Sequence, residues 1–195
     1  MDKKINTKKI IEFKKTRLKF PITEELATRF SPRFFKEDKI DSRILDSIFE
    51  AARWAPSAYN YQPWYFYWTQ KNSAFYKKIF SCLSERNEWA KTAPVFVVAC
   101  YLKKREGHIN KFAQYDLGSS TMSIITQAQS LGIYARQMGL FNKEKLQSFL
   151  KISRDYVPFV VIAIGKIGDY KKIDKNLLER ELQKRTRKVS ISKKI

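Results

Sequence analysis

Two arginines and a serine lie close together near the start of the chain, in the segment Arg29-Phe30-Ser31-Pro32-Arg33. A guanidinium group is planar and offers two parallel donors to two oxygens of one phosphate. The Ser31 hydroxyl adds a further donor between the two arginines. This spacing suits a phosphate-binding segment, and the alternative is a solvated charged loop or a surface ion pair.

A second group of polar side chains follows Pro56, which disfavours the helical conformation at the residue before it and so predicts a helix end. Ser57, Asn60 and Gln62 then place three hydroxyl or amide groups in a loop. The aromatic run that begins at Trp64 is typical of a buried strand. Polar groups between a helix end and a core strand can line a pocket for a flat polar ring. A capped helix-to-strand turn explains them equally well.

Other cofactor and catalytic chemistries lack their motifs. The six glycines show neither P-loop nor dinucleotide-fingerprint spacing, and there is no Gly-x-Ser-x-Gly elbow. His108, the single histidine, cannot form a zinc site by itself, so no metal is expected. These observations argue against kinases, P-loop NTPases and Rossmann dehydrogenases, and they leave room for a tightly bound cofactor held without a glycine loop.

The hydrophobic pattern predicts the elements that position these residues. Mixed helices and strands, without strict alternation, indicate an α+β fold with a mainly antiparallel sheet of four or five strands and helices on both sides. We expect strands near residues 64–70, 94–100, 133–137 and 159–165, and helices near residues 22–30, 42–55, 73–83, 110–131, 142–150 and 176–182. Pro21 marks a boundary between a basic N-terminal extension, residues 1–20, and a single domain, residues 21–195.

The net charge of +20 is concentrated at the two ends. Residues 1–20 carry eight basic and two acidic side chains, and residues 184–195 carry six basic side chains and no acid. Basic ends can attract nucleic acid or anionic lipid, or they can be solvated tails. For residues 1–20 we favour a solvated tail.

Nothing in the sequence indicates export or membrane insertion. No apolar run approaches the roughly 20 residues of a membrane helix, and the N-terminus has no secretory apolar region. Cys82 and Cys100 suggest free thiols in a reducing cytoplasm, although a disulfide between them stays open at this point.

Five segments, in this order, resemble motifs of the nitroreductase family, whose members bind FMN at a dimer interface. The resemblance covers roughly residues 22 to 189, and its motifs are Arg29–Phe35, Ala51–Trp64, Asp116–Gly118, Gln137–Phe141 and Arg185–Lys188. It implies a homodimer of nitroreductase-like fold with two shared FMN sites. It also implies that NAD(P)H is a transient co-substrate and that the acceptor is a small nitroaromatic, quinone-like or similar molecule.

The resemblance assigns cofactor-binding positions residue by residue. These positions are Arg29, Phe30, Ser31, Arg33, Pro56, Ser57, Ala58, Asn60, Asn87, Gln137, Met138, Gly139, Leu140, Arg185 and Arg187. Arg29, Ser31, Arg185 and Arg187 correspond to phosphate ligands, and Arg33 to a basic position facing the ring and ribityl side. Residues 56–58 correspond to a loop that the second subunit lays against the flavin. No protein side chain is expected as an obligatory acid or base, because flavin N5 carries the chemistry.

One position departs from the family pattern. Relatives usually have Gly-Phe where this chain has Leu140-Phe141, with Gly139 one place earlier, so the backbone N–H near flavin N5 shifts by one residue. This departure keeps open a flavin binder without reductase turnover. A second alternative is a protein that uses its basic ends on nucleic acid, with the flavin fold as a scaffold.

Overall fold

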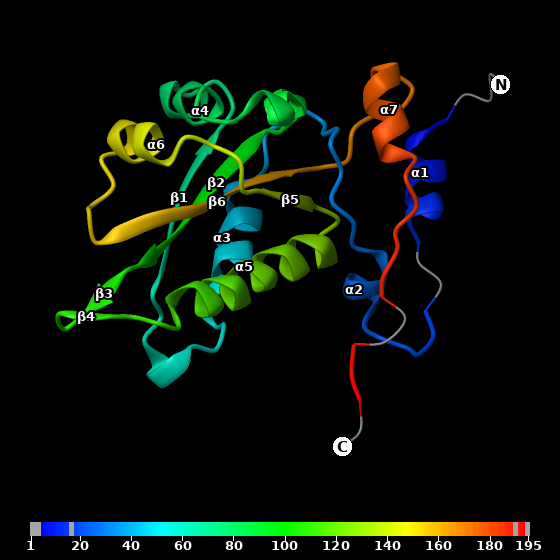
Figure 1. The fold of residues 1–195 in the computed structure, drawn as a ribbon. Coiled ribbons are helices and arrows are strands. Elements are labelled where there is room, and N and C mark those ends of the chain that lie inside the picture. The colour runs from blue at the N-terminus through cyan, green and yellow to red at the C-terminus, as the bar shows by residue number, and fades with distance from the viewer. Residues whose placement is uncertain (1–4, 16–17, 189–190, 194–195) are drawn as a thin grey trace.

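The computed structural model describes residues 5–15, 18–188 and 191–193, and its elements are shown in Figure 1. The helices are α1 (Thr7–Lys14), α2 (Glu24–Thr28), α3 (Ser42–Arg53), α4 (Ala74–Phe80), α5 (Ala113–Ser130), α6 (Lys143–Leu150) and α7 (Lys175–Glu181), with 3-10 turns η1 (Ala58–Asn60) and η2 (Glu85–Thr92). The strands are β1 (Trp64–Gln70), β2 (Val95–Leu102), β3 (Lys104–Arg105), β4 (His108–Ile109), β5 (Tyr134–Met138) and β6 (Tyr156–Gly165).

The central sheet has the strand order β1-β2-β6-β5, and each neighbouring pair is antiparallel. The two short strands β3 and β4 form a separate hairpin inside the predicted polar loop. The α+β class and the antiparallel four-stranded sheet expected from the sequence are therefore confirmed.

Strand β2 shows why the sheet is covered on both sides. Side chains alternate between the two faces of a strand. Phe96, Val98 and Cys100 belong to one hydrophobic cluster, and Val95 and Val97 belong to the other. Helices α4 and α6 cover the first face, whereas α3 and α5 cover the second (Figure 1). A strand that is apolar at every position therefore lies in the middle of three layers.

Local capping explains several predicted element ends. The Asp41 carboxylate accepts a hydrogen bond from the Arg43 amide at 2.8 Å, which starts α3. Asn142 caps α6 in the same way, through the Lys145 amide. Gly132 follows α5 with a φ of 69°, a conformation that glycine adopts readily. Helix α5 begins at Ala113 rather than near residue 110, because a turn formed by residues 110–112 precedes it.

Part of the N-terminal segment packs against the domain. Ile10 on α1 is fully buried in the hydrophobic cluster of the first sheet face. Figure 1 shows α1 beside α7, so a helix near the start of the chain lies next to one near its end. Residues 1–4 and 16–17 fall outside the described part. Pro21 lies in the loop between α1 and α2.

Cys82 and Cys100 are both buried free thiols, so they form no disulfide with each other in this structure. Within the described ranges, no helix combines the length and the apolar composition that crossing a bilayer requires. The same ranges contain no group of three or more His, Cys, Asp or Glu side chains that could hold a metal ion.

Candidate functional site

Three arginines from opposite ends of the chain converge on one hollow. Arg29 ends α2, whereas Arg185 and Arg187 follow α7. The hollow has a volume of about 520 Å³. Its lining consists of Leu18, Lys19, Ile22, Leu26, Arg29, Met122, Arg185, Arg187 and Lys188. Five of these side chains are basic and none is acidic among the described residues, so this cationic hollow is suited to an anion.

The positive charges of the cationic hollow repel one another. Burial, followed by the charge of Arg187, lowers the pKa of Arg29. Burial lowers the pKa of Arg185 as well, and Arg29 and Arg187 add to the effect. Within the described ranges none of these three arginines takes part in an ion pair. A dianionic group placed here would relieve the repulsion.

Hydrogen bonds fix two of these arginines. The Arg29 guanidinium donates to the Ser31 hydroxyl at a long 3.5 Å, so the two side chains face the same place. Arg185 donates to the carbonyl oxygens of Lys14 at 3.0 Å and Ala27 at 3.1 Å. The Arg185 side chain is therefore held between α1 and α2.

Arg33, which the sequence places with the phosphate segment, has a buried partner. Its guanidinium forms an ion pair with Glu181 at 2.9 Å, and the Tyr170 hydroxyl donates to the other Glu181 oxygen at 2.8 Å. Glu181 is 1% exposed. Burial, then the Glu181 charge, raises the pKa of Tyr170, so Tyr170 remains a neutral donor. Arg33 is thus tied to α7 as well as to its own segment.

Arg136 belongs to the same region, although sequence reasoning did not identify it. Its guanidinium donates to the backbone oxygen of Ser31 and lies over the Trp89 ring, 5.2 Å from the centroid. Burial lowers the Arg136 pKa to about 10, and the nearby Arg33 charge contributes. The signal in the sequence was a charged residue inside a predicted strand, β5.

The predicted ring-edge loop, residues 139–141, contacts the chain around η2, the turn that also carries Trp89. The Asn87 side-chain amide donates to the Leu140 carbonyl at 3.1 Å, and the Ser84 amide donates to the same oxygen at 3.1 Å. Gln137, Gly139 and Leu140 are exposed, whereas Met138 is buried. Asn87 therefore holds the loop 139–141 against η2.

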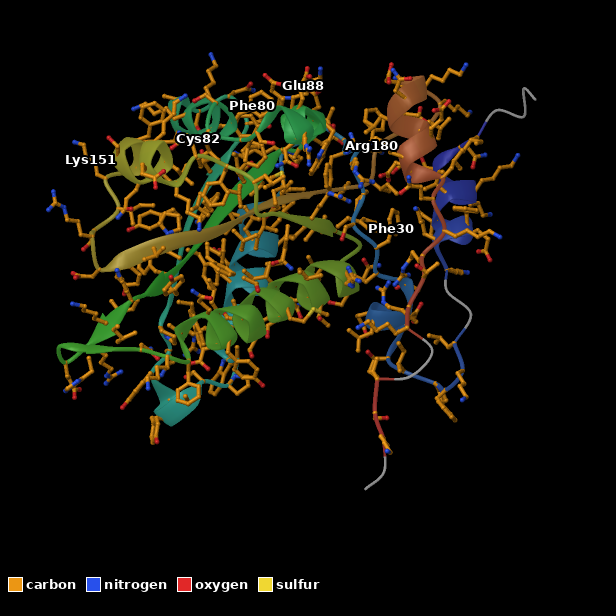
Figure 2. All side chains as sticks on the ribbon, in the orientation of Figure 1. Phe30, Phe80, Cys82, Glu88, Lys151 and Arg180 are labelled. Atoms are coloured by element: carbon orange, nitrogen blue, oxygen red, sulfur yellow. The ribbon has the colours of Figure 1, made fainter. Side chains whose placement is uncertain are left out.

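Contacts thus run continuously from the loop to the hollow. They lead from Leu140 to Asn87, through η2 to Trp89 and Arg136, and on to Ser31 and Arg29. Of the predicted site residues, this line of contacts joins Arg29, Ser31, Asn87 and Leu140. The Phe30 side chain, labelled in Figure 2, is not on this line. It is buried and packs edge to face against Tyr134 of β5.

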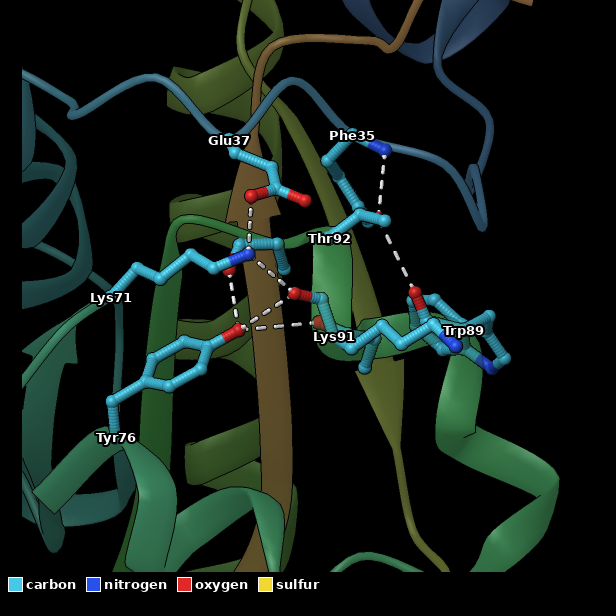
Figure 3. A network of polar contacts seen from close by, with 9 residues as sticks. Phe35, Glu37, Lys71, Tyr76, Trp89, Lys91 and Thr92 are labelled. Carbon is cyan, nitrogen blue, oxygen red and sulfur yellow. Dashed lines mark hydrogen bonds and ion pairs between the residues drawn. The ribbon is translucent and has the colours of Figure 1, made fainter. Parts of the chain in front are cut away.

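A polar network fixes η2 to its surroundings, as Figure 3 shows. The Thr92 hydroxyl accepts from the Phe35 amide at 3.2 Å and donates to the Trp89 carbonyl at 3.3 Å. Lys71 donates to the Lys91 carbonyl at 2.8 Å, and the Tyr76 hydroxyl donates to the Ala93 carbonyl at 2.7 Å. The element that carries Asn87 and Trp89 is therefore rigidly placed relative to the segment of Arg29 and Arg33.

The polar loop after Pro56 is also fixed. The buried Asp116 carboxylate accepts from the Ala58 amide at 3.2 Å, and the Ser57 hydroxyl accepts from the Gln62 amide at 3.0 Å. The Gln62 side chain donates to the Asn60 side chain at 2.9 Å. Positive φ values of 54° at Asn60 and 46° at Gln62 shape the turn. Within this subunit, Asn60 and Gln62 therefore bind each other across the turn.

This loop and the cationic hollow contact different parts of α5. Asp116, which binds the loop, is near the start of the helix, whereas Met122, in its middle, lines the hollow. At about 1.5 Å per residue these two positions are roughly 9 Å apart along the helix axis. Within one subunit, the structure does not bring residues 56–58 to the predicted phosphate ligands.

A groove lies along the face of α5 between these two places, with a volume of about 770 Å³. Its lining residues are small or polar, with Tyr115 and Met122 as the larger ones: Ala51, Gln114, Tyr115, Gly118, Ser119, Met122, Ser123, Thr126 and Gln127. Small side chains allow a second helix to approach closely.

The family follows from comparison with known proteins. The sequence profile described as "Nitroreductase family" matches residues 26–85 and 83–166, which is most of the chain. The chain therefore belongs to the nitroreductase family, and the resemblance noted in the sequence is confirmed. The match leaves out α1 and the C-terminal arginines.

Individual relatives agree with this assignment. A crystal structure described as "the oxidoreductase containing FMN" is 30% identical, with a TM-score of 0.82 and coverage of 89% of this chain and 91% of that one. A provisionally named NADH dehydrogenase/NAD(P)H nitroreductase from Methanothermobacter thermautotrophicus is 28% identical over 75% of this chain and 78% of its own length. An FMN-dependent nitroreductase from Clostridium difficile R20291 shares the fold at 22% identity, with a TM-score of 0.64 over 76% of this chain and 95% of that one.

Proposed function

We propose that this chain is an FMN-dependent NAD(P)H oxidoreductase that reduces nitroaromatic, quinone or similar acceptors in a ping-pong cycle. The observation that carries the proposal is the cationic hollow. Arg29, Arg185 and Arg187 meet there without an acidic neighbour in the described part of the chain, which suits the phosphate of FMN. The FMN-containing and NAD(P)H-named relatives support the same cofactors.

When bound, FMN supplies the hydride chemistry, and the protein supplies binding and orientation. Arg29, Ser31, Arg185 and Arg187 would hold the phosphate by charge-assisted hydrogen bonds. The exposed backbone at Gly139 and Leu140, held by Asn87, would lie along the ring edge.

Arg33 and Arg136 supply positive charge between these two ends. Glu181 is the acid paired with Arg33, and Arg136 contacts a carbonyl rather than a carboxylate. Two guanidinium groups therefore face one carboxylate here. The surplus positive charge would favour an electron-rich group at the ring and ribityl side of the site.

The co-substrates need no dedicated dinucleotide fold, because the nicotinamide only stacks transiently at the exposed site. Tyr59 and Tyr61 on the polar loop have ring centroids 5.3 Å apart, and Tyr59 is 81% exposed. We assign these rings to the wall of an aromatic or quinone-like acceptor site. In this arrangement they would come from the second subunit.

We also propose a homodimer with two shared sites. If two α5 faces pack antiparallel through the groove, the polar loop of one subunit approaches the cationic hollow of the other. The small residues of the groove support this arrangement, and Met122 lines both the groove and the hollow. Each site would then contain residues 56–58 from one protomer and Arg29 from its partner.

We expect light scattering to give the mass of a dimer carrying two FMN molecules. A matched test uses Gly118→Trp, which places a large side chain in the groove, and Lys111→Met, an exposed change outside it. Gly118→Trp should weaken dimerisation and FMN retention together, whereas Lys111→Met should leave both unchanged. A monomer that still binds stoichiometric FMN would contradict the shared site.

The proposed function is tested by turnover of deflavinated protein. We expect no oxidation of NADH or NADPH with a quinone or nitroaromatic acceptor until FMN is added. Protein that takes up FMN yet shows no turnover with any acceptor would support the alternative of a flavin binder without reductase activity. The nucleic-acid alternative is less favoured, because Lys14 and Arg185 are engaged within the fold rather than presented on free tails.

A further inference from the structure

Helix α1 is anchored to the end of the sheet by side chains from its first half. The Thr7 hydroxyl donates to the Gly168 carbonyl at 2.8 Å and accepts from the Tyr170 amide at 3.2 Å. Ile10 is fully buried in the core, and Asn6 caps the helix through the Lys9 amide. The helix is therefore fixed to the domain independently of the C-terminal segment.

Lys14, the last residue of α1, contacts both Gln183, which precedes the two arginines, and Arg185 itself. The Lys14 ammonium group donates to the Gln183 carbonyl at 2.8 Å, and the Lys14 carbonyl accepts from Arg185 at 3.0 Å. The Lys14 side chain is 8% exposed, unusually low for a lysine. Burial lowers its pKa, and Glu181 opposes that effect. One residue thus holds both the backbone and a side chain of the C-terminal segment.

The C-terminal segment needs such support. Residues 184–188 form neither helix nor strand, so no regular hydrogen-bond ladder fixes Arg185 and Arg187. A binding group that must be ordered at the moment of binding loses affinity through entropy, whereas a pre-ordered group does not. Besides Lys14, the Arg185 guanidinium has one other backbone partner, the Ala27 carbonyl.

We propose that α1 is a positioning element for the cationic hollow: through Lys14 it pre-orders Arg185 and Arg187 for the phosphate of the bound cofactor. This inference rests on the proposed function, because it takes the bound phosphate to be that of FMN. Helix α1 lies outside residues 26–166, which match the family profile.

The test compares Lys14→Met with Lys9→Met. Both substitutions remove one positive charge from α1. Lys9, however, is exposed, and among the described residues its ammonium group makes no hydrogen bond to the C-terminal segment. FMN and riboflavin are titrated into each deflavinated protein. We expect Lys14→Met to weaken FMN binding about tenfold, which corresponds to ~1.4 kcal/mol, with riboflavin changed less than about twofold. Lys9→Met should leave both affinities unchanged.

Two further measurements separate positioning from general destabilisation. Lys14→Arg keeps a cationic donor and should restore most of the FMN affinity. Hydrogen exchange of residues 183–188 should be faster in Lys14→Met than in the wild type, while that of β2 stays the same. These exchange rates report on the Lys14 contact even if the wild type binds neither flavin. A wild type that binds neither flavin would count against the proposed function, but not against the ordering of residues 183–188 by α1.

The inference is overturned if Lys14→Met binds FMN as tightly as the wild type. Equal weakening of FMN and riboflavin would also overturn it, because a loss that ignores the phosphate indicates a general structural role. Unchanged hydrogen exchange at residues 183–188 would show that Lys14 does not order the segment.

Discussion

Arg29→Ala should weaken FMN binding by roughly 10- to 100-fold and leave the weaker binding of riboflavin almost unchanged. A hydrogen bond to a charged group contributes on the order of 1.5–3 kcal/mol, and each 1.4 kcal/mol is about a factor of ten in affinity. Riboflavin has no phosphate, so the loss should be confined to FMN. Isothermal titration of both flavins into deflavinated protein measures the difference.

The charge balance of the hollow adds a sharper expectation. Arg29 lowers the pKa of Arg185 because the two charges repel each other, and no described acid lines the hollow. Removing Arg29 should therefore not lower the thermal stability of the deflavinated protein, although it lowers that of the FMN complex. Arg187→Ala should behave similarly. The double variant should lose less than the sum of the two, since both groups bind one phosphate.

Exposed Lys184 provides the matched control, because it lies in the same segment but does not line the hollow. Lys184→Ala should change FMN affinity little. If Arg29→Ala weakens FMN and riboflavin equally, or destabilises the deflavinated protein, then Arg29 is a structural residue and the phosphate assignment is wrong.

Glu181→Ala should give the largest loss of stability. Its carboxylate is 1% exposed and is shared by Arg33 at 2.9 Å and Tyr170 at 2.8 Å. Removing one partner of a buried ion pair leaves an uncompensated charge, which costs roughly 3–5 kcal/mol. For a domain of this size, that corresponds to a fall in Tm of roughly 6–20 °C.

Glu179→Ala is the control for this change, because Glu179 is exposed on the same helix. Surface substitutions of this kind usually stay within about 0.5 kcal/mol. Thermal unfolding followed by circular dichroism compares the two variants. A fall in Tm after Glu181→Ala no larger than that after Glu179→Ala would show that α7 is not held by this ion pair.

Much of the secondary structure could be predicted because its signals are local. Asp41 and Asn142 cap the helices that their positions indicate, and Gly132 ends α5 with the positive φ expected of it. The apolar run at Val95–Leu102 predicts a central strand, since only a strand buried on both faces is apolar throughout.

The ion pairs and the packing of the chain ends could not be read from local pattern. Arg33 and Glu181 are far apart in the sequence, and nothing near Arg33 indicates its partner. The burial of Ile10 could not be predicted either, because α1 has no clear apolar stripe: only Ile10 and Lys14 of this helix are buried. The convergence of Arg29 with Arg185 and Arg187 was predicted through the family resemblance, and spacing alone gave no reason for it.

The most direct test of the proposed activity is the absorption spectrum of the FMN-loaded protein under argon. We predict an oxidised-flavin spectrum that bleaches when NADH or NADPH is added and returns when a quinone or nitroaromatic follows. A protein that takes up no FMN, or bound FMN that neither nicotinamide bleaches, would contradict the assignment of this chain as an FMN-dependent NAD(P)H oxidoreductase.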